Sequence, residues 1–255
     1  MKGDITIETE GLVLHGHLAR PPASAAPRNK RYGVIVVHGF PSPPNGAGTV
    51  ASTLPPLAER IAAMDGAWTA LALNLRGTGR SGGDFSLAGW MRDLRAGIDY
   101  MVGEEKVDGV YLAGFARGGS LSICAAGEDD RVLGVAALGP TADFSEWTTD
   151  PRRFLAECRR LGMITSPTFP PDFDRWAREI RELRPLALVG KIPPRPLLLV
   201  HGSEDDIVPV ADSRVLADAA EGQCELRIVT GGGHLLRHDP RAIAVLLGWL
   251  ERQGA

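Results

Sequence analysis

Hydrophobic and polar positions change their spacing repeatedly along the chain, and these changes divide it into short strands and helices. Apolar and polar residues alternate over 5–8 and 12–19, which predicts an antiparallel hairpin near the N-terminus. The run at 33–37 is apolar throughout, as expected of a strand buried on both faces. Further strands are predicted over 68–75, 107–113, 132–138, 196–200 and 224–229, and helices over 50–64, 86–101, 120–126, 210–220 and 240–253.

Strands that alternate with helices predict an α/β fold with a mostly parallel, doubly wound sheet and right-handed crossovers. The hairpin adds an antiparallel edge. Residues 141–190 break the rhythm with amphipathic segments at 152–161 and 173–183, which indicates a helical insertion between two strands. We therefore expect one core made of residues 1–140 and 191–255, interrupted by the insertion.

Composition narrows the classes of protein that the chain can represent. Its 255 residues are 44% hydrophobic, enough for one sizeable core, and the net charge of −3 gives no reason to expect a nucleic-acid or membrane partner. Cys124, Cys158 and Cys224 are odd in number and form no C-x-x-C, so neither a disulfide framework nor a thiolate metal site is indicated. Neither a signal peptide nor a membrane-spanning run is recognisable, and we expect a cytoplasmic protein.

One turn carries the most specific chemical signal. The predicted strand at 107–113 runs into Gly114-Phe115-Ala116-Arg117-Gly118, and a helix follows. Strand, sharp glycine-flanked turn and helix are the context of a nucleophile elbow, G-x-S-x-G. The middle residue is Ala116, which has no nucleophilic atom. Ser120, one helical turn further on, would face along the helix and cannot replace it.

An acid and a histidine follow the elbow in the chain order that this type of site requires. Asp205 stands in the loop after the strand at 196–200, and His234 follows three glycines after the strand at 224–229. The carboxyl ends of parallel strands are where open α/β sheets place their sites. Asp206 or Glu204 could orient the histidine instead of Asp205.

Backbone N–H groups for an oxyanion hole are available on either side of the elbow. The loop His38-Gly39-Phe40 follows a buried strand, and its N–H groups are the natural first half of such a hole. The N–H of Arg117, directly after the elbow position, would be the second half.

Five motifs follow one another in the order of a known superfamily: 38–41 (HGFP), 76–81 (RGTGRS), 114–118 (GFARG), 201–205 (HGSED) with Val208-Pro209, and Gly233-His234. On these motifs the chain resembles the alpha/beta-hydrolase superfamily over essentially its whole length. The resemblance implies an esterase or thioesterase-like site with Asp205 as acid, His234 as base and Phe40 and Arg117 as oxyanion donors. It also implies that 141–190 is a lid, that the substrate is a small molecule and that no cofactor is needed. The family has Ser, less often Cys or Asp, where this chain has Ala116.

Several other signals favour structural roles. His38 and His201 beside strand ends are expected to be structural hydrogen-bonding groups, and His238 to lie on the surface. His15 and His17 have possible metal spacing but no third ligand nearby, so no metal site is expected. The G-x-G-x-x-G at 77–82 lies too far from the following helix for a dinucleotide site and is interpreted as a tight turn. The aromatic residues of the insertion could line an acyl pocket or form the insertion's own core: Trp147, Phe154, Phe169, Phe173 and Trp176.

Ala116 leaves three interpretations open. The natural protein could be a serine hydrolase that carries an engineered Ser-to-Ala knockout, in which case the native codon at position 116 encodes serine. Alternatively, Ala116 is natural and a His234–Asp205 dyad acts as general base in lyase or cofactor-independent chemistry. In the third interpretation the chain binds a small molecule without turnover, and replacing His234 does not affect that binding.

Overall fold

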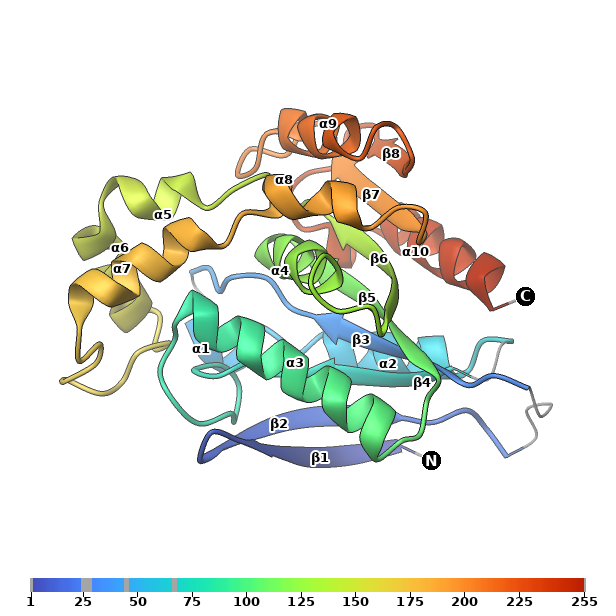
Figure 1. Ribbon diagram of the computed structural model, residues 1–255, viewed down its shortest axis with the longest axis horizontal. Coiled ribbons are helices and arrows are strands. Elements are labelled where there is room, and N and C mark those ends of the chain that lie inside the picture. Colours follow the sequence, from blue (N-terminus) through green and yellow to red (C-terminus); the bar gives the residue numbers. More distant parts are fainter. Residues whose placement is uncertain (1, 24–28, 44–45, 66–67, 255) are drawn as a thin grey trace.

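A single eight-stranded sheet organises the molecule (Figure 1), whose computed structural model describes residues 2–23, 29–43, 46–65 and 68–254. The strand order is β1-β2-β4-β3-β5-β6-β7-β8. The strands are β1 (Lys2–Thr9), β2 (Leu12–Ala19), β3 (Tyr32–Val37), β4 (Thr69–Leu73), β5 (Gly109–Phe115), β6 (Val132–Leu138), β7 (Leu197–Gly202) and β8 (Glu225–Val229). Strands β3 to β8 pair in parallel, whereas β2 pairs antiparallel with both β1 and β4. The predicted fold class, a mostly parallel sheet with an N-terminal antiparallel hairpin, is confirmed.

Helices cover both faces of the sheet, as the apolar strands require. On one face lie α3 (Leu87–Gly103), α4 (Arg117–Ala126) and α9 (Val210–Ala219), and on the other α2 (Leu54–Ala62) and α10 (Pro240–Gln253) (Figure 1). Each face has its own buried apolar cluster. Both faces of β3 and β5 are therefore excluded from water, which explains their unbroken apolar sequences.

The helix predicted over 50–64 is shorter than expected. A separate turn, α1 (Gly46–Thr49), precedes it, and α2 begins only at Leu54. Pro55 and Pro56 occupy the first turn of α2, where a missing backbone N–H costs no hydrogen bond. The prediction began at residue 50 because apolar positions keep the helical spacing there. In the structure, the two prolines determine that the helix starts at Leu54.

Between β6 and β7 the chain forms the predicted helical insertion, at the left end of the molecule in Figure 1. It contains α5 (Ser145–Thr149), α6 (Pro151–Arg160), α7 (Phe173–Glu182), α8 (Pro185–Leu188) and the 3-10 turn η1 (Val189–Lys191). Outside the insertion, a second 3-10 turn, η2 (Leu236–His238), precedes α10. The rings of Trp147 and Phe154 stack with centroids 4.5 Å apart, and Trp176 stacks on Phe154 at 5.7 Å. Aromatic packing thus holds the helices of the insertion together. No helix of the described ranges is long and apolar enough to cross a membrane.

Candidate active site

The backbone at Ala116 has the strained geometry of a nucleophile elbow. Its φ is 47° and its ψ is −123°, a conformation that costs a residue with a side chain about 1–3 kcal/mol. The surroundings hold it there: the Ala116 N–H donates to the Leu138 carbonyl at 2.7 Å. A Cβ atom on Gly114 would lie 2.3 Å from the Gly118 oxygen, and one on Gly118 would lie 2.2 Å from the His38 oxygen. Both glycines are required because strand and helix pass this close.

His234 and Asp205 form a hydrogen-bonded pair at the carboxyl ends of β8 and β7. The His234 Nδ1 lies 3.0 Å from Oδ2 and 3.1 Å from Oδ1 of Asp205, and the carboxylate is fully buried. A carboxylate accepts only, so Nδ1 carries the proton and Nε2 is left as the basic nitrogen. Among the alternatives left open by the sequence, the structure places Asp205, and neither Asp206 nor Glu204, in hydrogen-bonding contact with His234.

Four donors converge on the Asp205 carboxylate. Burial by itself would raise its pKa, but hydrogen bonds from His201, His234 and the N–H groups of Val208 and Ile207 outweigh burial and hold the pKa well below its usual range. Asp205 therefore stays ionised and can stabilise a positive charge on His234.

The candidate oxyanion donors lie next to the elbow. A Cβ on Gly39 would lie 3.1 Å from the Ala116 Cβ, so the loop after β3 packs directly against the elbow. Within the described part of the chain, the backbone N–H groups of Phe40 and Arg117 have no hydrogen-bond partner. Two unpaired N–H groups beside one position can bind a developing negative charge.

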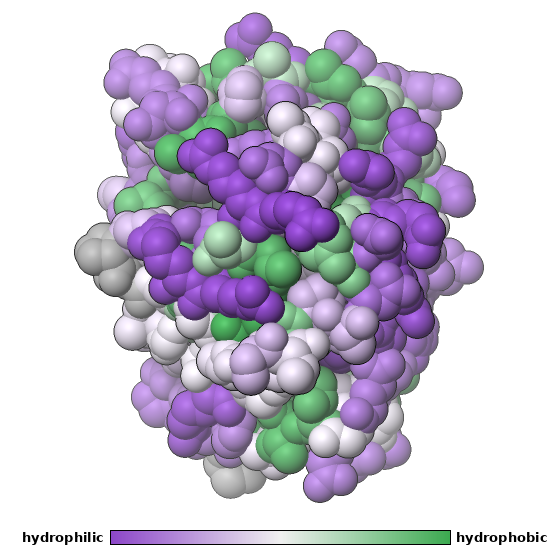
Figure 2. Space-filling view, turned by 90° about the vertical axis from the view of Figure 1, so that its left-hand side faces the viewer, coloured by the Kyte–Doolittle hydropathy of each residue, from purple (hydrophilic) through white to green (hydrophobic). Residues whose placement is uncertain are grey.

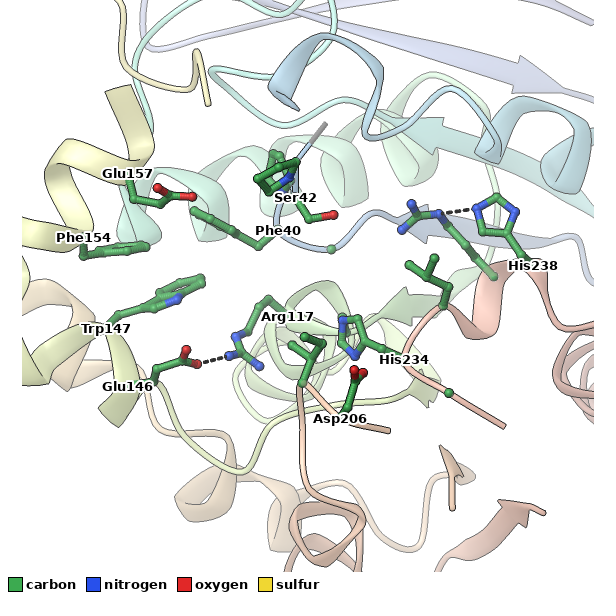
Figure 3. A pocket seen from close by; sticks show the side chains of 18 of the residues that line it. Phe40, Ser42, Arg117, Glu146, Trp147, Phe154, Glu157, Asp206, His234 and His238 are labelled. Carbon is green, nitrogen blue, oxygen red and sulfur yellow. Dashed lines mark hydrogen bonds and ion pairs between the residues drawn. The ribbon is translucent and has the colours of Figure 1, made fainter. Parts of the chain in front are cut away.

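A cleft of about 1440 Å³ opens over the elbow. Ala116, His234, Phe40 and Arg117 all line it. Figure 3 shows Trp147 and Phe154 on one side, His234 on the other, and Arg117 between them. Seen from the end that carries the insertion (Figure 2), hydrophobic residues lie in a hollow framed by hydrophilic side chains. The remaining wall residues are Gly39, Pro41, Ser42, Pro43, Glu146, Thr149, Asp150, Arg153, Glu157, Asp206, Ile207, Gly233, Leu235, Arg237, His238, Asp239, Pro240 and Arg241.

Three of the five aromatic residues considered for substrate contact do not line this cleft. Trp176 is buried and donates from Nε1 to the Phe85 carbonyl at 3.2 Å. Phe173 packs under the guanidinium of Arg152, and the backbone oxygen of Phe169 accepts from Arg159. Phe173 and Trp176 belong to α7, where Phe173 packs on Trp176 and Trp176 stacks on Phe154. Of the two roles that the sequence left open for Phe169, Phe173 and Trp176, these contacts favour the core of the insertion over a pocket wall.

The side chain of Arg117, which the sequence did not single out, also faces the cleft. Its guanidinium lies 5.4 Å from the centre of the Trp147 ring and donates to Glu146 at 2.7 Å. Burial lowers the pKa of Arg117, and the charges of Glu146, Asp212 and Asp205 partly offset this. The ion pair connects the elbow helix to α5 of the insertion.

The other histidines and Ser120 have structural contacts. Ser120 is buried and exchanges hydrogen bonds with the backbone of Thr141, so it is not available to a substrate. His201 contacts Ser213 and the Val208 carbonyl. His17 contacts Glu59 at 3.0 Å, and no group of three potential ligands that could hold a metal ion occurs within the described residues.

His38 is fully buried and held as the neutral imidazole. Its Nδ1 donates to the Gly39 carbonyl at 2.8 Å, and its Nε2 accepts from the Leu75 N–H at 3.1 Å. A proton on Nε2 would point at the Leu75 N–H, which is itself a donor, so the charged imidazolium is disfavoured. Burial lowers the pKa of His38 from 6.5 to about 4.

Stability is expected to fall in the pH range set by His38. Unfolded chains bind a proton at this residue near pH 6.5, whereas the folded protein does so only near pH 4, so the folded state loses stability as the pH falls through this window. The loss is about 3 kcal/mol in total. Urea unfolding at pH 7.5, 5.5 and 4.5 measures it. His38→Gln should remove that part of the pH dependence, whereas His238→Gln, on an exposed residue, should retain it. Identical slopes for His38→Gln and the unaltered chain would contradict this assignment.

A comparison with models of protein families shows to which family the chain belongs. The model described as the prolyl oligopeptidase family (Peptidase_S9) matches residues 60–254. The chain belongs to the prolyl oligopeptidase family. The match includes the elbow, Asp205 and His234, and it places this family member among the alpha/beta hydrolases, as the motifs predicted.

Solved structures share the fold of this prolyl oligopeptidase family member. The hydrolase GrgF from Penicillium sp. sh18 is 22% identical, with a TM-score of 0.70 over 99% of this chain and 98% of its own. Est1E from Butyrivibrio proteoclasticus, solved with ferulic acid bound, is 24% identical, with a TM-score of 0.70 over 98% of both chains. The Pyrococcus furiosus esterase Pf2001 is 19% identical, with a TM-score of 0.69 over 100% of this chain and 92% of its own. A comparison with curated protein sequences gives no match.

Proposed function

We propose that the cleft is an acyl-transfer site for a small-molecule ester or thioester, of the Ser-Asp-His type but with Ala116 at the nucleophile position. One observation carries this proposal: the strained elbow, two unpaired N–H groups and the His234–Asp205 pair are brought together at one cleft. No cofactor is needed for such chemistry. The esterases with the same fold support the substrate class, and the ferulic acid bound to Est1E is a compound of suitable size.

The reaction in this chain proceeds without an acyl-enzyme, because Ala116 offers no atom to form one. In the proposed mechanism the carbonyl oxygen of the substrate lies against the N–H groups of Phe40 and Arg117. A water molecule attacks the carbonyl carbon and gives its proton to Nε2 of His234. The histidine then returns the proton to the departing alkoxide or thiolate, and Asp205 stabilises the intervening imidazolium. Water is a poorer nucleophile than an activated serine, so this hydrolysis is slow.

The insertion at 141–190 is proposed to act as the lid of this site. Trp147 and Phe154 supply an apolar wall, suited to the hydrocarbon part of an acyl compound. The Arg117–Glu146 ion pair joins the lid to the elbow helix. Within the lid, Trp176 stacks on Phe154 and Phe173 packs on Trp176.

Replacing the general base tests the proposal against the two other interpretations. His234→Ala and Asp205→Asn should each lower the residual hydrolysis of p-nitrophenyl butyrate, measured above the uncatalysed rate, by roughly 10²-fold. Asp206→Asn removes a neighbouring carboxylate that also lines the cleft and serves as the matched control, with little change expected. Unaltered turnover in His234→Ala, together with retained ligand binding, would favour a non-catalytic binding protein. Loss of an elimination or other non-hydrolytic activity in the same variant would instead favour lyase chemistry.

A further inference from the structure

One half-buried arginine of the cleft has no acidic partner within the described residues. Arg237 belongs to η2, three residues after His234, and lines the same cleft. Its Nε donates to Nε2 of His238 at 3.1 Å, and within the described ranges no carboxylate lies within ion-pair distance of it. Two other arginines of the wall are neutralised: Arg117 by Glu146 at 2.7 Å and Arg241 by Asp239 at 2.7 Å. The fourth, Arg153, forms no ion pair within the described residues either, but its side chain is exposed to water. Arg237 is therefore the cleft arginine set apart by burial without a counter-ion.

Burial makes this unpaired charge costly. Arg237 is half-buried, and burial lowers its pKa with no carboxylate to oppose the effect. A charge removed from water without an opposite charge destabilises the fold. Residues of this kind are typical of functional sites, where a ligand supplies the missing partner.

The position of Arg237 suits a group on a bound substrate. Its charge contributes to lowering the pKa of the buried His38, so Arg237 lies near the residues that lead from β3 to Phe40. Asp206, a wall carboxylate without a side-chain partner in the described ranges, lies on the other side of His234 from His238 in the view of Figure 3. The remaining acidic side chains of the wall are engaged: Glu146, Asp150, Glu157 and Asp239 pair with an arginine or cap a helix. A negative charge on the substrate thus has one half-buried cation without a counter-ion to bind, since Arg153 is exposed to water.

We infer that Arg237 recognises a carboxylate carried by the substrate, so that the preferred compounds are half-esters of dicarboxylic acids. This inference rests on the proposed acyl-transfer function. With Nε engaged by His238, the two terminal nitrogens of the guanidinium remain as parallel donors, and their spacing matches the two oxygens of a carboxylate. A phosphate would also match a guanidinium. We favour a carboxylate over a phosphate because Trp147 and Phe154 make the opposite wall apolar. An apolar wall suits a hydrocarbon chain between the ester and the acid.

Binding to the unaltered Ala116 chain provides the test, because it requires no turnover. Titration calorimetry compares monoethyl succinate, adipate and suberate with their diethyl counterparts, so that the unknown spacing is covered. We expect at least one half-ester to bind about tenfold or more tightly than its diester. Arg237→Gln should abolish this ratio and Arg237→Lys should reduce it. Arg241→Gln removes an equal charge from the same wall, but from an arginine already paired with Asp239, and should preserve the ratio.

Thermal unfolding separates lost recognition from lost structure. Arg237→Gln removes an unpaired half-buried charge, so its Tm should equal or exceed that of the unaltered chain. Equal affinities for half-esters and diesters across the series would overturn the inference. Tighter binding of ethyl 4-phosphonobutyrate than of every half-ester would overturn the choice of carboxylate. If instead the half-esters bind as expected while His234→Ala leaves turnover unchanged, the proposed chemistry fails and Arg237 recognition stands.

Discussion

Replacing Ala116 by serine is expected to raise ester hydrolysis by about 10³-fold or more and to make it proceed through an acyl-enzyme. The backbone at this position already has φ 47° and ψ −123°, so a serine Oγ would enter the cleft without rearrangement of the fold. The Nε2 of His234 is free to accept its proton, since Nδ1 is engaged by Asp205. Stopped-flow hydrolysis of p-nitrophenyl butyrate should show a burst of one product molecule per chain. A fluorophosphonate should label residue 116 alone.

Two controls make this result specific to the hydroxyl. Ala116→Gly relieves the backbone strain and adds no nucleophile, so it should raise the free energy of unfolding by about 1 kcal/mol and leave hydrolysis at the level of the Ala116 chain. Ala116→Ser combined with His234→Ala should show neither burst nor labelling. If Ala116→Ser itself is unlabelled and no faster, the elbow and His234 do not form a nucleophilic site.

The largest effect on stability is expected from the buried ion pair behind the oxyanion loop. Asp93 on α3 is fully buried and accepts from the Arg76 backbone N–H at 2.7 Å, from Nε at 3.0 Å and from Nη2 at 2.7 Å. Asp93→Asn leaves the buried guanidinium with only Glu10 as a charged partner. We expect the free energy of unfolding to fall by about 3–5 kcal/mol, measured by urea denaturation at pH 7.

A second aspartate on the same helix supplies the comparison. Asp99 is 64% exposed and pairs with Arg131 at 2.8 Å. Asp99→Asn should cost less than about 1 kcal/mol, because solvent screens exposed pairs. Similar losses for the two variants would show that burial does not set the strength of the Arg76–Asp93 pair. Asp93→Asn should also impair the site, since the adjoining Leu75 and Thr78 hold the ring of His38.

The proximity of the candidate catalytic residues was predictable because topology alone brings them together. Parallel strands end at one edge of a sheet, so the elbow after β5, Asp205 after β7 and His234 after β8 had to converge there. Glycine spacing indicated the close approaches at Gly114 and Gly118, which the structure contains. The choice among Glu204, Asp205 and Asp206 depended on loop conformation, which a strand pattern does not encode.

The walls of the cleft were much less predictable. Phe154 and Trp176 both occur on amphipathic helices of the insertion and both are buried, yet only Phe154 lines the cleft. Burial demands the same residue types from a pocket wall and from a core, so periodicity cannot separate them. Arg237 resembled any of the arginines that are scattered among acids along the chain. It is distinguished by being half-buried with no carboxylate at ion-pair distance among the residues that the structure describes, and both observations require coordinates.

The elbow has a consequence for how the activity of this fold can change over time. Its conformation is fixed by the Leu138 carbonyl and by the packing of Gly114 and Gly118, none of which depends on the side chain at position 116. The backbone conformation that directs residue 116 into the cleft and the chemical reactivity of its side chain can therefore change independently. Each alanine codon differs from a serine codon by a single nucleotide. A lineage with this scaffold can move between dormant and reactive forms by point mutation, while the fold and the substrate cleft are retained.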